Sequence, residues 1–211
     1  LDTTIPVRVL FENSNVESLA AAISSHVSSG NIPALVAGPR PTTIPLSLAQ
    51  QRMWFLSRFD PESAVNNIPI ALSLSGQLNL SALQLAVSDV VDRHESLRTI
   101  YPEAGGQGQQ VILPASEVSF DLTPVTLGGT RIEEALLTLA LAGFDVTMSV
   151  PFRVQLFEVG ADAFVLAFVM HHIAADGFSM RPLTRDVMVA YAARVSNGVP
   201  NWTPLEVQYA D

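Results

Sequence analysis

Apolar residues recur with the spacing of a helix in some segments of this chain and with the spacing of a strand in others, and one segment is apolar throughout. Residues 163–170 (AFVLAFVM) form a run rich in valine and phenylalanine. A membrane-spanning helix needs about 20 such residues, so this run is too short to cross a bilayer. Strands with one face in water alternate apolar and polar residues, whereas strands covered on both faces do not. The run therefore predicts a β-strand buried on both faces of a sheet.

The periods elsewhere predict the elements around that strand. Helices are expected at 48–59, with Ser47 as N-cap, at 79–94, 131–142 and 178–196; strands are expected at 67–75, 97–101, 110–113, 118–125 and 152–158. Residues 105–108 (GGQG) are expected to form a hairpin turn, because neither the Walker nor the dinucleotide-binding pattern surrounds them. Helices and strands alternate without a regular βαβ repeat. The sequence therefore predicts an α/β fold with a mixed sheet flanked by helices.

The first 28 residues are expected to form a separate helical appendage. Apolar residues at helical spacing predict short helices at 6–11 and 16–26, and Asn15 can cap the second. Two short helices cannot bury their apolar stripes by themselves. Residues 29–43 are rich in proline, glycine and serine, which predicts a linker. The main domain is therefore expected to span residues 44–211.

Composition narrows the classes of function. Hydrophobic residues make up 48% of the chain, which indicates a folded protein with a real core. Twenty acidic against eleven basic residues give a net charge of -9, which argues against nucleic-acid partners. The absence of cysteine excludes disulfides and thiol nucleophiles and agrees with a reducing compartment. With no signal peptide or membrane-spanning stretch visible, we expect a cytoplasmic protein without a membrane partner.

The strongest chemical signal is His171-His172-Ile-Ala-Ala-Asp176-Gly177, which directly follows the buried strand. Ends of buried strands are common places for sites in α/β proteins. Successive side chains of a strand point to opposite faces, so one histidine should be structural and the other free to act. A free imidazole titrates near neutrality and suits general-base work on an amine or hydroxyl. Asp176 could orient a ring or hold the loop through a cation, and Gly177 would allow a positive φ or a close backbone approach.

Other interpretations of the motif are weaker. A zinc site usually needs three or four protein ligands, and the remaining histidines, His26 and His94, lie far away in the sequence in unremarkable settings. A serine hydrolase would carry a G-x-S-x-G elbow, which is absent. Taken alone, the motif also allows two purely structural histidines.

Three segments together resemble a known family. Residues 47–56 (SLAQQRMWFL), 93–99 (RHESLRT) and 170–179 (MHHIAADGFS) are similar, in this order, to the first three signatures of nonribosomal peptide synthetase condensation domains. The resemblance covers about residues 44–211 and ends within a fourth signature, of which only 208–211 (QYAD) is present. Residues 5–27 resemble the closing helices of a peptidyl carrier domain, mainly through 7–12 (VRVLFE).

The resemblance implies a chloramphenicol-acetyltransferase-like fold of two lobes with the active site in a tunnel between them, and this chain would be the N-terminal lobe. Donor and acceptor carrier domains would deliver thioester substrates on 4'-phosphopantetheine arms, with no cofactor bound directly. The acceptor amine would attack the donor thioester and form a peptide bond. The partners would include the missing C-terminal lobe and an adenylation domain. Because the second lobe is missing, we expect this chain alone to be inactive and prone to self-association.

The resemblance also assigns roles to single residues. His172 would lie at the reaction centre, either as a base or as the group that orients the amine, and His171 would be structural. Asp176 would hold the loop through an ion pair with Arg98. The backbone N–H of Gly177 would approach the thioester oxygen.

Two alternatives remain within the same superfamily. One is an epimerisation domain, a dual epimerisation and condensation domain, or a chain-releasing acyltransferase. The other is a catalytically silent domain that recruits a carrier or a tailoring enzyme. Silent domains usually lose the second histidine or the glycine, whereas His172 and Gly177 are both present. Cyclising relatives carry aspartate at the first histidine, so His171 argues against them.

Overall fold

The computed structural model describes residues 6–25 and 35–211, which belong to two compact units, 1–36 and 37–211. In the first unit, helices α1 (Val7–Glu12) and α2 (Val16–Ser25) form where the sequence predicts them. The side chain of Asn15 accepts a hydrogen bond from the N–H of Ser18 (2.8 Å), which is the expected N-cap. His26, the predicted helix end, lies outside the described residues.

The second unit begins earlier than the predicted domain start at residue 44. Residues 37–43 belong to it, although the sequence predicts them to be part of the linker. Arg40 forms ion pairs with Glu95 and with Asp211, both at 2.7 Å, and these contacts hold this extended segment on the domain. The other part of the predicted linker lies mainly outside the described residues.

The main sheet contains four strands in the order β2-β8-β7-β6. Its elements are β2 (Asn67–Ser75), β8 (Ala163–His171), β7 (Phe152–Gly160) and β6 (Val125–Thr126). The first three pair antiparallel, whereas β6 runs parallel to β7. The sheet is therefore mixed, as predicted, and β8 lies between two long partners.

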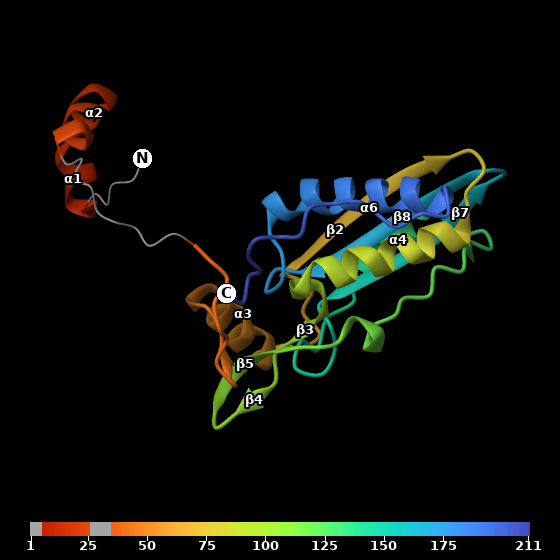
Figure 1. The fold of residues 1–211 in the computed structure, drawn as a ribbon, viewed down its shortest axis with the longest axis horizontal. Coiled ribbons are helices and arrows are strands. Elements are labelled where there is room, and N and C mark those ends of the chain that lie inside the picture. Colours follow the sequence, from red (N-terminus) through yellow and green to blue (C-terminus); the bar gives the residue numbers. More distant parts are fainter. Residues whose placement is uncertain (1–5, 26–34) are drawn as a thin grey trace. The chain divides into compact units, whose positions relative to one another are not determined.

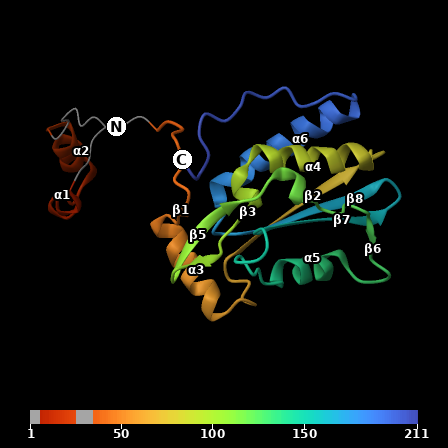
Figure 2. The same cartoon turned by 60° about the horizontal axis from the view of Figure 1, so that its bottom comes forward.

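Helices cover both faces of this sheet. Helices α4 (Leu80–Arg93) and α6 (Met180–Val195) lie on one face, and α5 (Ile132–Leu141) lies on the other (Figure 1, Figure 2). Alternate residues of β8, such as Phe168, pack against the α4 and α6 side, whereas Val165 and Ala167 pack against the α5 side. The strand is buried on both faces, which confirms the interpretation of the apolar run.

A second, smaller sheet lies next to the helix that contains most of the first signature, residues 47–56. It consists of β1 (Ile44–Pro45), β3 (Thr99–Ile100), β4 (Glu103–Ala104) and β5 (Gln107–Ile112), and it lies next to α3 (Leu48–Phe59). Gly105 and Gly106, both at positive φ, form the predicted hairpin turn between β4 and β5. A Cβ at Gly108 would lie 2.9 Å from the ring of Trp54, so only glycine lets α3 approach the hairpin this closely.

The structure contradicts most of two predicted strands, 97–101 and 118–125. Glu95–Arg98 forms a 3-10 helix, η1, and only Thr99–Ile100 of the predicted 97–101 is a strand. In the predicted 118–125, only the final residue belongs to a strand. The side chain of Gln84 on α4 accounts for this, because it donates to the carbonyl of Phe120 (2.6 Å) and accepts from the N–H of Leu122 (3.2 Å). A helix side chain therefore satisfies backbone groups that a strand partner would otherwise pair.

The turn after α5 requires glycine at position 143. A Cβ there would lie 2.6 Å from backbone atoms of Pro61 and Glu62. The guanidinium of Arg153 donates to the carbonyls of Ala142 and Gly143, and it also lies 3.7 Å from the ring centroid of Phe144. This turn thereby places Phe144 beside the end of β8.

We expect Gly143→Ala to lower the free energy of unfolding by about 1–3 kcal/mol, because backbone atoms must move to admit the methyl group. The matched control is Gly160→Ala, whose Cβ would meet only Ala163 at an ordinary 3.7 Å. Urea denaturation of the two variants checks the prediction. Equal stability of both variants would contradict it.

Candidate active site

The two histidines lie where the central strand of the main sheet ends. The N–H of His171 donates to the carbonyl of Pro151 (3.0 Å), and the N–H of His172 donates to the carbonyl of Asn66 on the opposite side (2.8 Å). These bonds extend the β-ladder through both residues and fix their side chains on opposite sides. His171 is buried and His172 is exposed, which is the division that strand alternation predicts.

His171 is held as a neutral ring. Its Nδ1 accepts a hydrogen bond from the N–H of Ile173 (3.1 Å), so the ring proton is on Nε2. The edge of the ring meets Phe144, with the centroids 6.2 Å apart. Burial, and secondarily the neighbouring His172, lowers the pKa of His171 to about 4. His171 is therefore uncharged at neutral pH and fixed by its own loop.

His172 lines a cavity of about 240 Å³ between its loop and helix α3. The floor and walls come from α3, from the loop after β8 and from Tyr209 near the end of the chain. The other lining residues are Ala49, Gln50, Met53, Ile173, Ala174, Ala175, Asp176 and Ser179. The cavity therefore combines an exposed imidazole with mainly small and apolar neighbours.

Two buried side chains fix the loop through one carbonyl oxygen. The carbonyl of Ile173 accepts from Nε2 of Gln50 (3.4 Å) and from the hydroxyl of Tyr101 (3.4 Å). Gln50 and Ser47 form the capping box of α3, in which the N–H of Ser47 donates to Oε1 of Gln50 (3.0 Å). Neither Gln50 nor Tyr101 is predicted to be a site residue from the sequence. The S-x-x-Q pattern signals Gln50, whereas no local pattern signals Tyr101.

Asp176 acts as a cap rather than as an ion-pair partner. Its Oδ1 accepts from the N–H (3.0 Å) and the hydroxyl (2.8 Å) of Ser179 and so starts the short 3-10 helix η3 (Gly177–Ser179) ahead of α6. These hydrogen bonds, chiefly that from the Ser179 hydroxyl, hold the pKa of Asp176 below its ordinary value. The carboxylate is therefore ionised and fixes the start of the helix that follows the motif.

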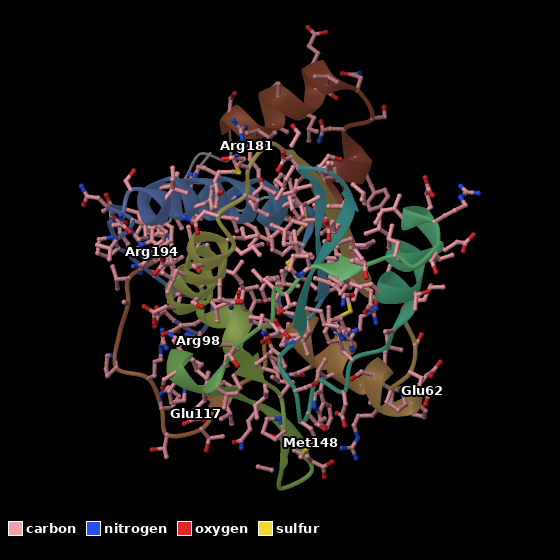
Figure 3. The ribbon with its side chains drawn as sticks, turned by 90° about the vertical axis from the view of Figure 1, so that its right-hand side faces the viewer. Glu62, Arg98, Glu117, Met148, Arg181 and Arg194 are labelled. Carbon is pink, nitrogen blue, oxygen red and sulfur yellow. The ribbon has the colours of Figure 1, made fainter. Side chains whose placement is uncertain are left out.

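The predicted ion pair between Asp176 and Arg98 is wrong. The guanidinium of Arg98 donates to the carbonyls of Leu113 (2.6 Å) and Asp92 (3.4 Å), and the carboxylate within ion-pair distance is that of Glu95 (3.8 Å). Arg98 ends η1 beside β5, where the N–H of Leu113 donates to its carbonyl. Arg98 is labelled in Figure 3. Its role in the structure is to join η1 to the end of β5.

Gly177 does not need glycine for its backbone conformation. Its φ lies outside the left-handed region, so of the two possibilities that the sequence allows, a positive φ and a close backbone approach, the first is not realised. A Cβ built on Gly177 would meet nothing within 4 Å. The residue is exposed and leaves open space beside the loop.

The second signature contributes an ion cluster that the sequence analysis did not predict. Asp186 of α6 is only 3% exposed and accepts from Arg93 (3.0 Å), His94 (2.9 Å) and Arg185 (2.9 Å). Burial raises the pKa of Asp186, but its hydrogen bonds, led by that from Arg185, outweigh burial and lower it. His94, whose setting is unremarkable in the sequence, therefore belongs to a partly buried ion cluster. The buried carboxylate of Asp186 thus joins the C-terminal end of α4 to α6. Arg194 of α6, which is labelled in Figure 3, forms an ion pair with Asp89 of α4 at 2.6 Å.

Two features are absent from residues 6–25 and 35–211, the part of the chain that the structure describes. No cluster of three or more metal-binding side chains is present in that part of the chain. None of its helices has the length and apolar character needed to span a bilayer.

Comparison with known sequences identifies relatives along the whole chain. A family model described as "Condensation domain" matches residues 41–211. The chain is 42% identical, over its full length, to a "Probable non-canonical nonribosomal peptide synthetase (NRPS) CymA" from Salinispora arenicola (strain CNS-205). It is 43% identical, over 96% of its length, to a "Dimodular nonribosomal peptide synthase" from Bacillus subtilis (strain 168). The chain spans 3% and 8% of these proteins, respectively.

Solved structures show the same fold. The X-domain from teicoplanin biosynthesis is 37% identical with a TM-score of 0.79, and the match covers 84% of this chain and 38% of that one. The starter condensation domain of rhizomide synthetase RzmA is 21% identical with a TM-score of 0.67, covering 77% and 40%. The fold is thus the α/β, chloramphenicol-acetyltransferase-like fold that the resemblance implied. By its family model and its relatives, this chain belongs to the condensation domain family of nonribosomal peptide synthetases.

Proposed function

We propose that this chain is the N-terminal lobe of a condensation domain that forms peptide bonds within a longer synthetase. One observation carries the proposal: His172 is exposed in a cavity at the end of the buried strand, while its neighbour His171 is locked and neutral. Such a pair leaves one imidazole free to act on a substrate.

In the proposed reaction, an amine on the acceptor carrier attacks the carbonyl carbon of the donor thioester. The C–N bond forms, the C–S bond breaks, and the thiolate that leaves on the donor's phosphopantetheine arm receives the proton that the amine loses and becomes a free thiol. His172 accepts a hydrogen bond from the attacking amine, orients its lone pair and takes up its proton as the bond forms. Because both substrates are tethered, positioning supplies much of the rate.

The remaining motif residues support this arrangement in different ways. His171 keeps the strand end packed, and Asp176 fixes the start of η3. The open space beside Gly177 leaves room for a thioester to approach its backbone N–H. Arg98 supports the site only indirectly, through the connection between η1 and β5.

The proposed partners follow from the same function. Donor and acceptor carrier domains bring the substrates, a C-terminal lobe forms the second wall of the site, and an adenylation domain supplies the next residue. We also propose that residues 1–28 are the closing helices of a carrier domain. In support, Val7, Phe11 and Val16 of α1 and α2 are each at least 66% exposed, as expected for helices that would pack against the rest of a carrier domain.

A specific observation favours a second function, that of a recruitment domain. The X-domain from teicoplanin biosynthesis has also been solved as a complex with OxyB, and in that structure it is 36% identical to this chain with a TM-score of 0.77. A silent domain of this kind would bind a protein partner without forming a bond. Peptide-bond formation therefore separates the two functions.

For His172→Ala, we expect dipeptide formation in a synthetase that contains this domain to fall at least about 100-fold, because the amine loses its base. Both carriers should still be loaded, which is the internal control, and mass spectrometry of carrier-bound species measures both steps. Undiminished dipeptide would remove His172 from the mechanism. A native domain that forms no dipeptide between loaded carriers would instead support recruitment.

For Gly177→Ala, we expect stability and activity to separate. The added methyl group meets no protein atom, so the free energy of unfolding should change by less than about 0.5 kcal/mol. Dipeptide formation should fall at least about tenfold, because the methyl group enters the space through which the thioester approaches. Full activity of this variant would show that the thioester does not pass there.

His171 should make the domain less stable in acid. The unfolded histidine binds a proton below its ordinary pKa of 6.5, whereas the folded one stays neutral until about pH 4, so protons favour the unfolded state in this window. Stability should therefore fall by about 3 kcal/mol as the pH drops from 6.5 to 4. His171→Asn keeps an acceptor for the N–H of Ile173 but does not titrate. If urea denaturation gives native and variant proteins the same pH slope, the neutral buried ring is disproved.

A further inference from the structure

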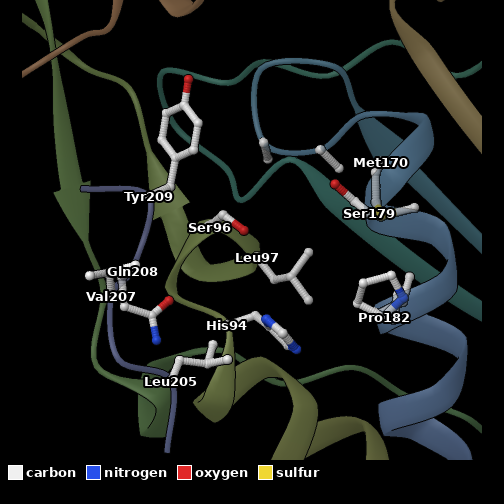
Figure 4. A pocket seen from close by; sticks show the side chains of 13 residues that line it. His94, Ser96, Leu97, Met170, Ser179, Pro182, Leu205, Val207, Gln208 and Tyr209 are labelled. Atoms are coloured by element: carbon white, nitrogen blue, oxygen red, sulfur yellow. The ribbon is translucent and has the colours of Figure 1, made fainter. Parts of the chain in front are cut away.

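A second cavity, of about 300 Å³, adjoins the cavity that contains His172 (Figure 4). The two share Ala174, Ala175, Ser179 and Tyr209 as lining residues, so both lie against the same loop. The second cavity extends between η1, the start of α6 and the segment 205–209. Most of its walls are apolar, with side chains such as Leu97, Met170, Leu183, Leu205 and Val207.

One polar group in this cavity has a defined hydrogen-bonding role. Nε2 of His94 faces Asp186, and a carboxylate only accepts hydrogen bonds, so the ring proton is on Nε2. Burial lowers the pKa of His94 despite the opposing effect of Asp186, which keeps the ring neutral at pH 7. Nδ1 is therefore an unprotonated acceptor.

Nδ1 of His94 is also free to bind a ligand. Within the described residues it has no hydrogen-bond partner. The buried side-chain atoms that lack a partner there are Oδ1 of Asn67 and Nε of Arg98, so Nδ1 of His94 is not a buried atom. It is therefore accessible, and the ring lines this cavity. Arg93 and Arg185 hold Asp186 in place, so the imidazole is fixed from behind. The result is a rigid acceptor in an apolar surrounding.

Tyr209 lies between the two cavities. Its side chain is 60% exposed and forms, among the described residues, one hydrogen bond, between its hydroxyl and Oγ of Ser47 (2.8 Å). Exposed groups exchange such a bond for water at little cost in free energy. Rotation of Tyr209 would therefore join the space beside His172 to the space beside His94.

We propose that the second cavity binds the side chain of one substrate while its reacting group lies beside His172, and that His94 selects a side chain that is apolar along its length and ends in a hydrogen-bond donor, such as a phenol. This inference rests on the proposed function, because that function supplies the substrate. A side chain without a donor would leave Nδ1 of His94 desolvated and unpaired, which lowers affinity. The side chain belongs either to the donor acyl group or to the acceptor amine.

Binding of two small probes to this chain tests the cavity without any catalysis. Para-cresol and toluene differ by the one hydroxyl group that the acceptor would recognise. In NMR titrations we expect both probes to shift the methyl resonances of Leu97 and Leu183, with para-cresol binding at least about fivefold more tightly. Equal affinities in the native chain would overturn the role of His94.

Three variants locate the effect. His94→Phe should retain toluene binding and lose the preference for para-cresol. Ser96→Ala, a change at another polar side chain of the same cavity, should keep the preference. Leu205→Trp fills the cavity while every residue of the ion cluster keeps its identity, and it should abolish binding of both probes, so the inference remains testable even if His94→Phe does not fold. Unchanged binding in Leu205→Trp would overturn the location.

The synthetase assay then identifies the source of the side chain. Tyrosine and phenylalanine are compared first on the donor carrier and then on the acceptor carrier, and a preference for tyrosine that disappears in His94→Phe marks the carrier involved. No preference on either carrier overturns the inference. If His172→Ala abolishes dipeptide formation but the probes do not bind, the proposed function stands and this inference falls. Undiminished dipeptide in His172→Ala removes the proposed function and, with it, the identity of the ligand.

Discussion

The β-ladder through the central strand is the interaction on which the rest of the structure depends. Strand β8 pairs along its whole length with β2 on one side and β7 on the other. Helices cover both of its faces, so its side chains from Val165 to His171 are buried and its backbone groups pair within the sheet. The ladder continues through the N–H groups of both histidines. Because the ladder fixes the backbone there, the strand sets the side of the sheet on which each imidazole lies, and the N–H of Ile173 then fixes the ring of His171.

Beyond the ladder, the site is stabilised by a few polar contacts around a short turn. One carbonyl, that of Ile173, accepts from Gln50 and Tyr101, which come from segments far apart in the sequence. Asp176 fixes the other end of the turn through Ser179. His172, directly before the first of these fixed points, and Gly177, directly after Asp176, are exposed and remain open. The same loop is therefore rigid in its backbone and accessible at the residues that would meet a substrate.

Local patterns predicted the features that depend on neighbouring residues. The buried strand, the cap at Ser47, the glycine hairpin and the opposite directions of the two histidines all follow from periodicity or from the conformational needs of single residues. Contacts between distant segments could not be predicted in this way. The hydrogen bond from Gln84 to the carbonyl of Phe120 takes the place of strand pairing in that segment. The guanidinium of Arg98 donates to backbone carbonyl oxygens, and not to the carboxylate of Asp176 as predicted. His94 seemed ordinary in sequence because its partner, Asp186, lies in another helix.

One oxygen atom joins two parts of the molecule that would otherwise be independent. Oγ of Ser47 accepts from the N–H of Gln50 (3.2 Å) at the beginning of α3 and is also within 2.8 Å of the hydroxyl of Tyr209. The first turn of that helix and the aromatic ring between the two hollows thus share one hydroxyl group. Because Gln50 caps the helix independently of Tyr209, the ring can exchange its bond for water and turn away while α3 keeps its N-cap.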